Sequence, residues 1–124
     1  DYVVEGADLS AFNNVYWTNH YYPGDTSEIV QSFVTAYEDK FGSTPSAFAA
    51  TGYDCMYMYK AAIEAAGSTD SAAVQQALWD VTYDGVSGHI AFDDTNGDAV
   101  RDTAYIKVCD TAAGAWTLEK SQTA

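Results

Sequence analysis

The period of the apolar residues changes twice along this chain, and this change constrains the fold more than any other feature. Residues 11–18 combine aromatic and β-branched side chains, as strands do, and a Pro-Gly turn signal follows them. Apolar residues then recur at helical spacing between residues 25 and 81, and strand-like alternation begins at residue 88. The sequence therefore predicts one strand, three helices and a β meander, in that order.

Capping residues predict where the helices begin and end. Asp25 stands three residues before a glutamate, which is a capping relation, and Gly42 offers the left-handed conformation that ends a helix. Thr44 precedes a proline that suits the first turn of the second helix, and Gly67 ends that helix. The segment from Ser68 to Ser71 is expected to cap the third helix. The expected helices are 26–41, 46–66 and about 68–81.

The second helix is rich in alanine, which lets neighbouring elements approach closely, so we expect it to be covered on both sides. Strands are expected over 88–92, 104–108 and 115–118, with an Asn-Gly turn after the first of them. This order indicates an α/β layered fold, with few strands for a complete sheet of its own.

The charge balance excludes several classes of protein. The 124 residues carry 18 acidic and 5 basic side chains, and the net charge of -13 repels phosphate backbones, so we expect no nucleic-acid partner. Hydrophobic residues make up 48% of the chain, which argues against a disordered acidic tail. The long uncharged stretches are interrupted by polar residues, and none resembles a membrane span.

An acidic cluster near residue 95 is the densest candidate for a cation site. An EF-type loop that begins at Asp94 needs glycine at its sixth position and glutamate at its twelfth, but Ala99 and Tyr105 stand there. A solvated hairpin turn is therefore the favoured interpretation. The cluster consists of Asp93, Asp94, Asn96 and Asp98.

Histidines and cysteines do not form metal sites in this sequence. His20 and His89 have no second ligand at metal spacing, so hydrogen-bonded structural roles are favoured over ligation or base catalysis. For Cys55 and Cys109, two buried free thiols are favoured, and a disulfide stays open. We predict no metal and no cofactor. Motifs for nucleophilic, nucleotide-binding or metalloprotease chemistry are absent, which leaves a carboxylate-based hydrolase as the remaining enzymatic alternative.

Phe48 is the aromatic residue with two competing interpretations. It lies in the first turn of the second helix, where backbone N–H groups could face a carboxylate, but from the residues alone a core position is favoured. Tyr53 and Tyr57 are four residues apart, and we expect them to pack one helix face into a core.

Several segments in order resemble one family. They read VYWTNHYYPGD, then EIVQSFVTAYEDKFGSTPSAFAATGYD, then AAGSTD, and finally GVSGHIAFDDTNGD. The chain resembles the C-terminal part of a type 1 periplasmic-binding-protein-like receptor, of the branched-chain amino acid (Leu/Ile/Val) group that feeds ABC transporters. That resemblance implies a fragment of a three-layer α/β receptor with two lobes. Residues 1–18 would belong to the second lobe, 19–84 to the helical first lobe, and 85–124 to a β meander of the second lobe.

The resemblance also implies which residues move and which bind. Hinge crossings would fall at Thr18, Asn19 and His20, and again at Ser87 and Gly88. Phe48 matches an aromatic residue that packs beside the ligand side chain, which reverses the preference for a core position. Asp1 lies near the place of an acidic residue for the ligand's ammonium group.

The implied protein is a receptor that binds a small amino acid by hinge closure and is not an enzyme. Its partners would be the amino acid and a transporter permease. Its place would be extracellular or periplasmic, as a lipoprotein anchored to the cell surface. A ligand-sensing regulator domain of the same fold is the alternative. As a fragment, the chain is expected to expose apolar surface and to self-associate.

Overall fold

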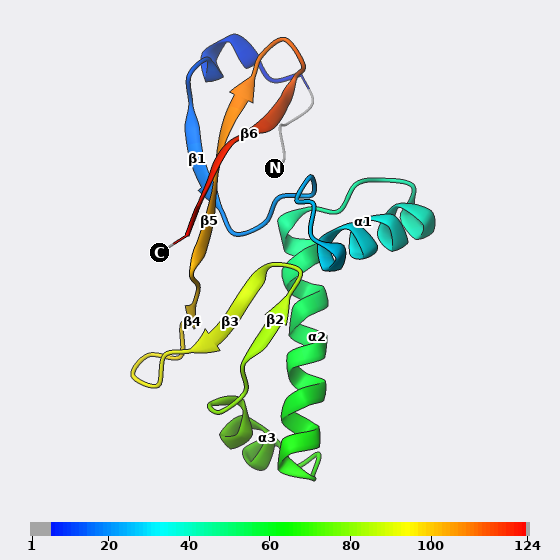
Figure 1. Ribbon diagram of the computed structural model, residues 1–124, viewed down its shortest axis with the longest axis vertical. Coiled ribbons are helices and arrows are strands. Elements are labelled where there is room, and N and C mark those ends of the chain that lie inside the picture. The colour runs from blue at the N-terminus through cyan, green and yellow to red at the C-terminus, as the bar shows by residue number, and fades with distance from the viewer. Residues whose placement is uncertain (1–5, 124) are drawn as a thin grey trace.

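The computed structural model describes residues 6–123, and Figure 1 shows two parts joined by two stretches of chain. We call the three-stranded sheet of β1, β5 and β6 the long sheet, and residues 20–100 the helical part. The elements are η1 (Leu9–Phe12), β1 (Tyr16–Asn19), α1 (Glu28–Phe41), α2 (Ala47–Ala66), α3 (Ser71–Leu78), β2 (Tyr83–Gly85), β3 (Gly88–Phe92), β4 (Ala99–Val100), β5 (Thr103–Asp110) and β6 (Ala115–Thr123).

The first strand is shorter than predicted, because residues 11 and 12 end a 3₁₀ helix and residues 13 and 14 form a turn. Asp8 caps this helix, and its carboxylate accepts hydrogen bonds from the backbone N–H of Ser10 at 3.0 Å and from the Ser10 hydroxyl at 2.6 Å. Asn14 then adopts a φ of 60°, a conformation that asparagine tolerates better than most residues. The extended strand therefore starts at Tyr16 and not at residue 11.

The single β meander predicted over 85–124 is wrong. β5 pairs with β1 and β6 to form the long sheet, whereas β3 and β4 join β2 in a separate small sheet. The strand β2 was not predicted, since it has three residues and directly precedes a tight turn. Strands β3, β5 and β6 were predicted, and the last two extend further than expected. Residues 88–100 thus lie in the sheet beside the helices, and the division into lobes stays a prediction.

The predicted glycine C-termini of α1 and α2 are confirmed, but the N-terminal capping residues of these two helices differ from those predicted. Gly42 and Gly67 end α1 and α2 with φ values of 69° and 59°. α2 is capped by Ser46 and not by Thr44, because the Ser46 hydroxyl accepts from the backbone N–H of Ala49 at 3.3 Å. α1 likewise begins after Ser27 and not after Asp25. Asp70, which caps α3, lies within the predicted capping segment 68–71. α3 ends at Leu78, three residues earlier than expected.

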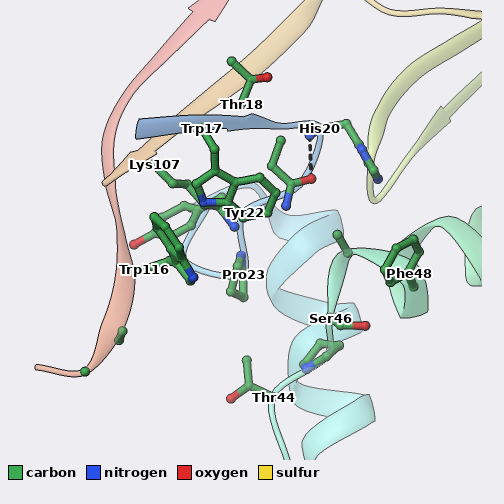
Figure 2. A pocket seen from close by; sticks show the side chains of 15 residues that line it. Trp17, Thr18, His20, Tyr22, Pro23, Thr44, Ser46, Phe48, Lys107 and Trp116 are labelled. Atoms are coloured by element: carbon green, nitrogen blue, oxygen red, sulfur yellow. Dashed lines mark hydrogen bonds between the residues drawn. The ribbon is translucent and has the colours of Figure 1, made fainter. Parts of the chain in front are cut away.

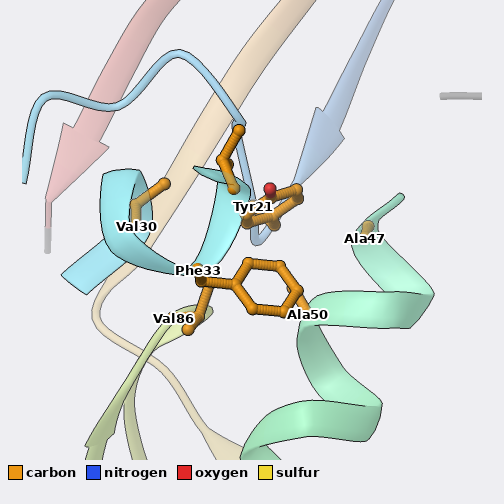
Figure 3. Close-up of a cluster of buried hydrophobic side chains, with 7 residues drawn as sticks. Tyr21, Val30, Phe33, Ala47, Ala50 and Val86 are labelled. Carbon is orange, nitrogen blue, oxygen red and sulfur yellow. The ribbon is translucent and has the colours of Figure 1, made fainter. Parts of the chain in front are cut away.

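Two clusters of buried side chains stabilise the helical part. The larger one joins α1, the start of α2 and the β2–β3 turn, as Figure 3 shows. Its buried members are Tyr21, Val30, Phe33, Val34, Ala47, Ala50 and Val86. The smaller one packs α3 against the end of α2 through Ala62, Val74 and Val81.

The expectation that α2 is covered on both sides is wrong for the part of the chain that the structure describes. The helix buries one face and exposes Met56, Tyr57 and Tyr59 on the other. Tyr53 and Tyr57 are both exposed, so their predicted core role is wrong. Their rings contact those of Phe33 on α1 and Tyr83 on β2. Over residues 6–123, no helix combines the length and apolar character needed to cross a membrane.

Candidate ligand-binding site

A groove of about 720 Å³ lies between the long sheet and the N-terminal end of α2 (Figure 2). β1, β5 and β6 supply one wall, and the segment before α2 supplies the other. Its lining residues with large or polar side chains include Trp17, His20, Tyr22, Phe48, Lys107 and Trp116. The groove therefore joins residues that are almost one hundred positions apart in the sequence.

Aromatic rings and a buried amine form the sheet side of the groove. The ring centroids of Trp17 and Trp116 are 5.7 Å apart, in an edge-to-face arrangement. Lys107 is only 1% exposed, and its Nζ lies 5.5 Å from the ring of Trp17 and 5.6 Å from that of Tyr22. Burial lowers the pKa of Lys107 to about 8. This wall therefore suits apolar or flat groups of a ligand better than a positively charged group of a ligand.

Phe48 is 87% exposed, so the interpretation of this residue as core is wrong. Ala47, Ala50 and Asp54 are buried on one face of α2, at the three- and four-residue spacing of a helix. Phe48 follows Ala47 directly and points about 100° away from that face. Figure 2 shows it on the first turn of α2, apart from the Trp17–Trp116 pair. An exposed aromatic ring at a groove is available for a ligand, and that role stays a prediction.

The predicted residues at the first crossing lie together at the end of β1. Thr18 and Asn19 are the last residues of that strand, and the Asn19 side-chain oxygen accepts from the backbone N–H of His20 at 2.8 Å. His20 is half-buried, and its Nε2 has no hydrogen-bond partner among the described residues, whereas a backbone hydrogen bond with Ala47 acts on the pKa of its ring. The expected hydrogen-bonded role stays a prediction. Burial and the nearby charge of Arg101 lower the pKa of His20 below its ordinary value.

Ser87 and Gly88, the predicted second crossing, lie in the β2–β3 turn. The carboxylate of Asp54 on α2 holds this turn by accepting from the backbone N–H groups of Val86 and Ser87, both at 2.8 Å, and from the Ser87 hydroxyl at 2.6 Å. The chain passes to the long sheet later, at 101–102, between β4 and β5. Any hinge role of Ser87 and Gly88 therefore stays a prediction.

Sequence reasoning missed Asp54 and Arg101. Asp54 is 0% exposed, although carboxylates are rarely buried unless they are paired or hydrogen-bonded. The signal was present, since this acid stands among alanine and aromatic residues on the apolar face of α2. Arg101 is one of only 5 basic residues in the chain, and it stands at the start of the second passage.

The remaining candidate residues make contacts that are typical of structural roles. The acidic cluster forms the predicted turn, in which Asp93 accepts from the backbone N–H and hydroxyl of Thr95, and these two bonds lower the pKa of Asp93. His89 Nδ1 lies 2.6 Å from the Asp84 carboxylate, which confirms a hydrogen-bonded structural role.

Both cysteines are free, but Cys55 is exposed on α2, so the prediction of two buried thiols is wrong for Cys55 and right for Cys109. Within residues 6–123, no three metal-ligating side chains cluster. Asp1 lies outside the described residues.

Comparison with known proteins identifies the family. Residues 1–114 match the sequence pattern of the family described as Periplasmic binding protein. This chain belongs to that family. A comparison with curated protein sequences gives no match.

Solved structures of the family extend the comparison. The leucine binding protein LivK from Thermotoga maritima shares 30% identity over 91% of this chain, with a TM-score of 0.75. An ABC transporter substrate-binding protein from Desulfitobacterium hafniense in complex with Leu shares 27% identity over 90% of the chain, with a TM-score of 0.76. The branched-chain amino acid transporter substrate binding protein LivJ from Streptococcus pneumoniae, in complex with isoleucine, shares 25% identity over 90% of the chain, with a TM-score of 0.69.

The chain covers only 32%, 32% and 30% of those three structures. It therefore spans about a third of their length. The predicted mixed α/β fold and the predicted family, including its branched-chain amino acid relatives, are confirmed.

Proposed function

We propose that the protein to which this chain belongs is the solute-binding receptor of an ABC transporter and that it binds a branched-chain or related amino acid by closure of two lobes. Three observations support the proposal: the family match over residues 1–114, the leucine-binding and isoleucine-bound relatives, and a groove that joins two separate parts of the chain. In this proposal the protein has no catalytic role, acts outside the cytoplasmic membrane as a lipid-anchored receptor, and delivers its solute to a permease.

Phe48 is the single observation that carries the amino-acid assignment. A phenylalanine that is 87% exposed on the first turn of a helix gains no stability from a core, so its apolar surface is free for another contact. In a receptor for an apolar amino acid, such a ring would form one wall for the aliphatic side chain, while polar groups hold the ammonium and carboxylate ends. Asp1 remains the proposed residue for the ammonium end.

Calorimetric titration of the full-length protein tests the proposal. Leucine, isoleucine and valine are expected to bind, and Phe48→Ala is expected to weaken binding by ~1–3 kcal/mol, the usual range for an aromatic contact at a binding site. Met56→Ala is a matched control, because Met56 is exposed on the same helix and lies outside the groove. Equal affinities for Phe48→Ala and the unmodified protein would remove Phe48 from the site. If no amino acid binds, the receptor proposal fails.

A sensor domain of a regulator is the second candidate, because the same two-lobe closure can report a solute without transport. The two roles are distinguished by a pull-down of the full-length protein, loaded with the amino acid, against the permease encoded by a neighbouring gene. Association with a permease supports transport, and association with a signalling protein supports the regulator.

A further inference from the structure

Arg101 connects the second passage of the chain to the helical part. Its Nη1 donates to the backbone oxygen of Ser87 at 2.6 Å and lies 3.1 Å from the Ser87 hydroxyl. Ser87 is 3% exposed and is itself held by Asp54 of α2. The guanidinium therefore fastens the second passage, two residues before β5, to a turn that cannot move without breaking buried hydrogen bonds.

Tyr105 makes a second connection, four residues further along. Its hydroxyl donates to the carboxylate of Asp25 at 2.6 Å, across 80 residues of sequence. Asp25 lies in the first passage, between β1 and α1, and Tyr105 pairs with Asn19 at the end of β1. The ring of Tyr105 also lies 6.1 Å from that of Tyr22. The hydroxyl contact therefore fastens the long sheet to the entry of α1.

No buried hydrophobic cluster of the described residues extends from the helical part into the long sheet. Both clusters consist of residues from the helices, the small sheet and the segments beside them. Apart from the contacts of Tyr22 with Tyr105 and Lys107, apolar packing among the described residues does little to hold the two parts at one angle. Two polar contacts at separate points can do so, because one contact permits rotation about itself and a second contact removes that freedom.

We propose that the Arg101–Ser87 and Tyr105–Asp25 contacts form a latch that sets the resting angle between the long sheet and the helical part. Arg101 and Tyr105 are thus positioning residues, and neither needs to touch the solute. The latch itself does not depend on the proposed receptor function, but its effect on binding does. If the angle is already set, closure around the solute costs less conformational entropy. Both contacts involve a charged group, which makes them stronger than neutral hydrogen bonds and reversible.

Distance measurement between two spin labels tests the latch without any solute. Cys55 is exposed on α2 and accepts one label, Glu119→Cys on β6 accepts the other, and Cys109→Ala removes the buried thiol. In this background, pulsed electron resonance on the full-length protein gives the distribution of distances between the parts. Tyr105→Phe deletes one hydroxyl, and Arg101→Gln removes the guanidinium. Each variant is expected to broaden the distribution and to raise the ratio of unlatched to latched molecules about tenfold.

Matched controls separate the latch from general effects. Tyr59→Phe removes an exposed hydroxyl on α2, and Lys60→Gln removes an exposed charge there, and both are expected to leave the distribution unchanged. Asp25→Asn keeps an acceptor for Tyr105 without the charge and is expected to lie between the unmodified protein and Tyr105→Phe.

Unchanged distributions in both Tyr105→Phe and Arg101→Gln would overturn the inference. Broadening that is accompanied by loss of the near-ultraviolet circular dichroism would also overturn it, because the residues would then support folding and not the angle. If the distribution broadens as expected but no amino acid binds the unmodified protein, the latch stands and the receptor proposal fails.

Discussion

Replacement of Asp54 by asparagine perturbs the most buried polar contact of the helical part. The carboxylate accepts three hydrogen bonds, two from backbone N–H groups and one from the Ser87 hydroxyl. In the better orientation of the amide, its oxygen still serves Ser87, but its NH₂ group faces the N–H of Val86 and leaves that donor without an acceptor. An unsatisfied buried donor costs about 1–3 kcal/mol, and the two remaining bonds lose the assistance of the charge.

Asp54→Asn is therefore expected to lower the free energy of unfolding by about 2–4 kcal/mol and the Tm by roughly 10 °C. Denaturant unfolding of the chain, followed by circular dichroism, measures the difference. Asp39→Asn on α1 is the matched control, since Asp39 is exposed near the end of its helix, and a change within about 0.5 kcal/mol is expected. A loss below about 1 kcal/mol for Asp54→Asn would refute the reasoning, because the turn would then be held by something else.

Gly85→Ala perturbs the same contact from the other side. A Cβ atom on Gly85 would lie 2.5 Å from the Asp54 carboxyl carbon. The carboxylate cannot move away without giving up its hydrogen bonds, so we expect a loss of stability of about 1–3 kcal/mol. The same unfolding experiment measures it. If Asp54→Asn and Gly85→Ala disrupt one contact, their effects combined in the double variant will be smaller than the sum of the two.

Two further predictions follow from exposure and titration. Burial, followed by the nearby charge of Arg101, lowers the pKa of His20 below its ordinary value of 6.5, although a backbone hydrogen bond with Ala47 and the charge of Asp54 oppose this shift. The folded protein therefore binds this proton more weakly than the unfolded chain. The stability that His20 contributes should then be fully present above pH 6.5 and fall as the pH drops below it, with a shallower fall in His20→Gln. Equal slopes in His20→Gln and the unmodified protein would contradict this prediction. The isolated chain exposes Phe41 and Tyr57 beside a groove between α1 and α2, so light scattering is expected to give a mass above that of a monomer, and Tyr57→Ser is expected to reduce it. A monomer at all concentrations would contradict this expectation.

Local signals in the sequence were sufficient for the helices and for some turns. Gly42 and Gly67 end α1 and α2 because only glycine adopts positive φ without a steric penalty. The Asn-Gly turn after β3 formed for the same kind of reason. These features depend on residues within about one helical turn of each other, and they are therefore readable in a single sequence.

The capping residues of α1 and α2 were predicted less well, because more than one polar residue lies near the start of each helix. The sequence pattern indicated Thr44 as the cap of α2, but Ser46 caps the helix because its hydroxyl accepts from the backbone N–H of Ala49. Asp25 does not cap α1, and its carboxylate instead accepts a hydrogen bond from the hydroxyl of Tyr105. A partner that is 80 residues away left no trace in the local pattern.

The sequence alone determined the helices, their glycine ends and, through the resemblance of its segments, the family. Only the tertiary structure decided that β3 pairs with β2 while β5 joins β1, that Asp54 is buried, and that Phe48 is exposed. The physical reason is that helix formation depends on hydrogen bonds four residues apart, whereas strand pairing and burial depend on which distant segments meet. The same period-two pattern fits either sheet, and in the folded chain the buried Asp54 carboxylate on α2 holds the β2–β3 turn.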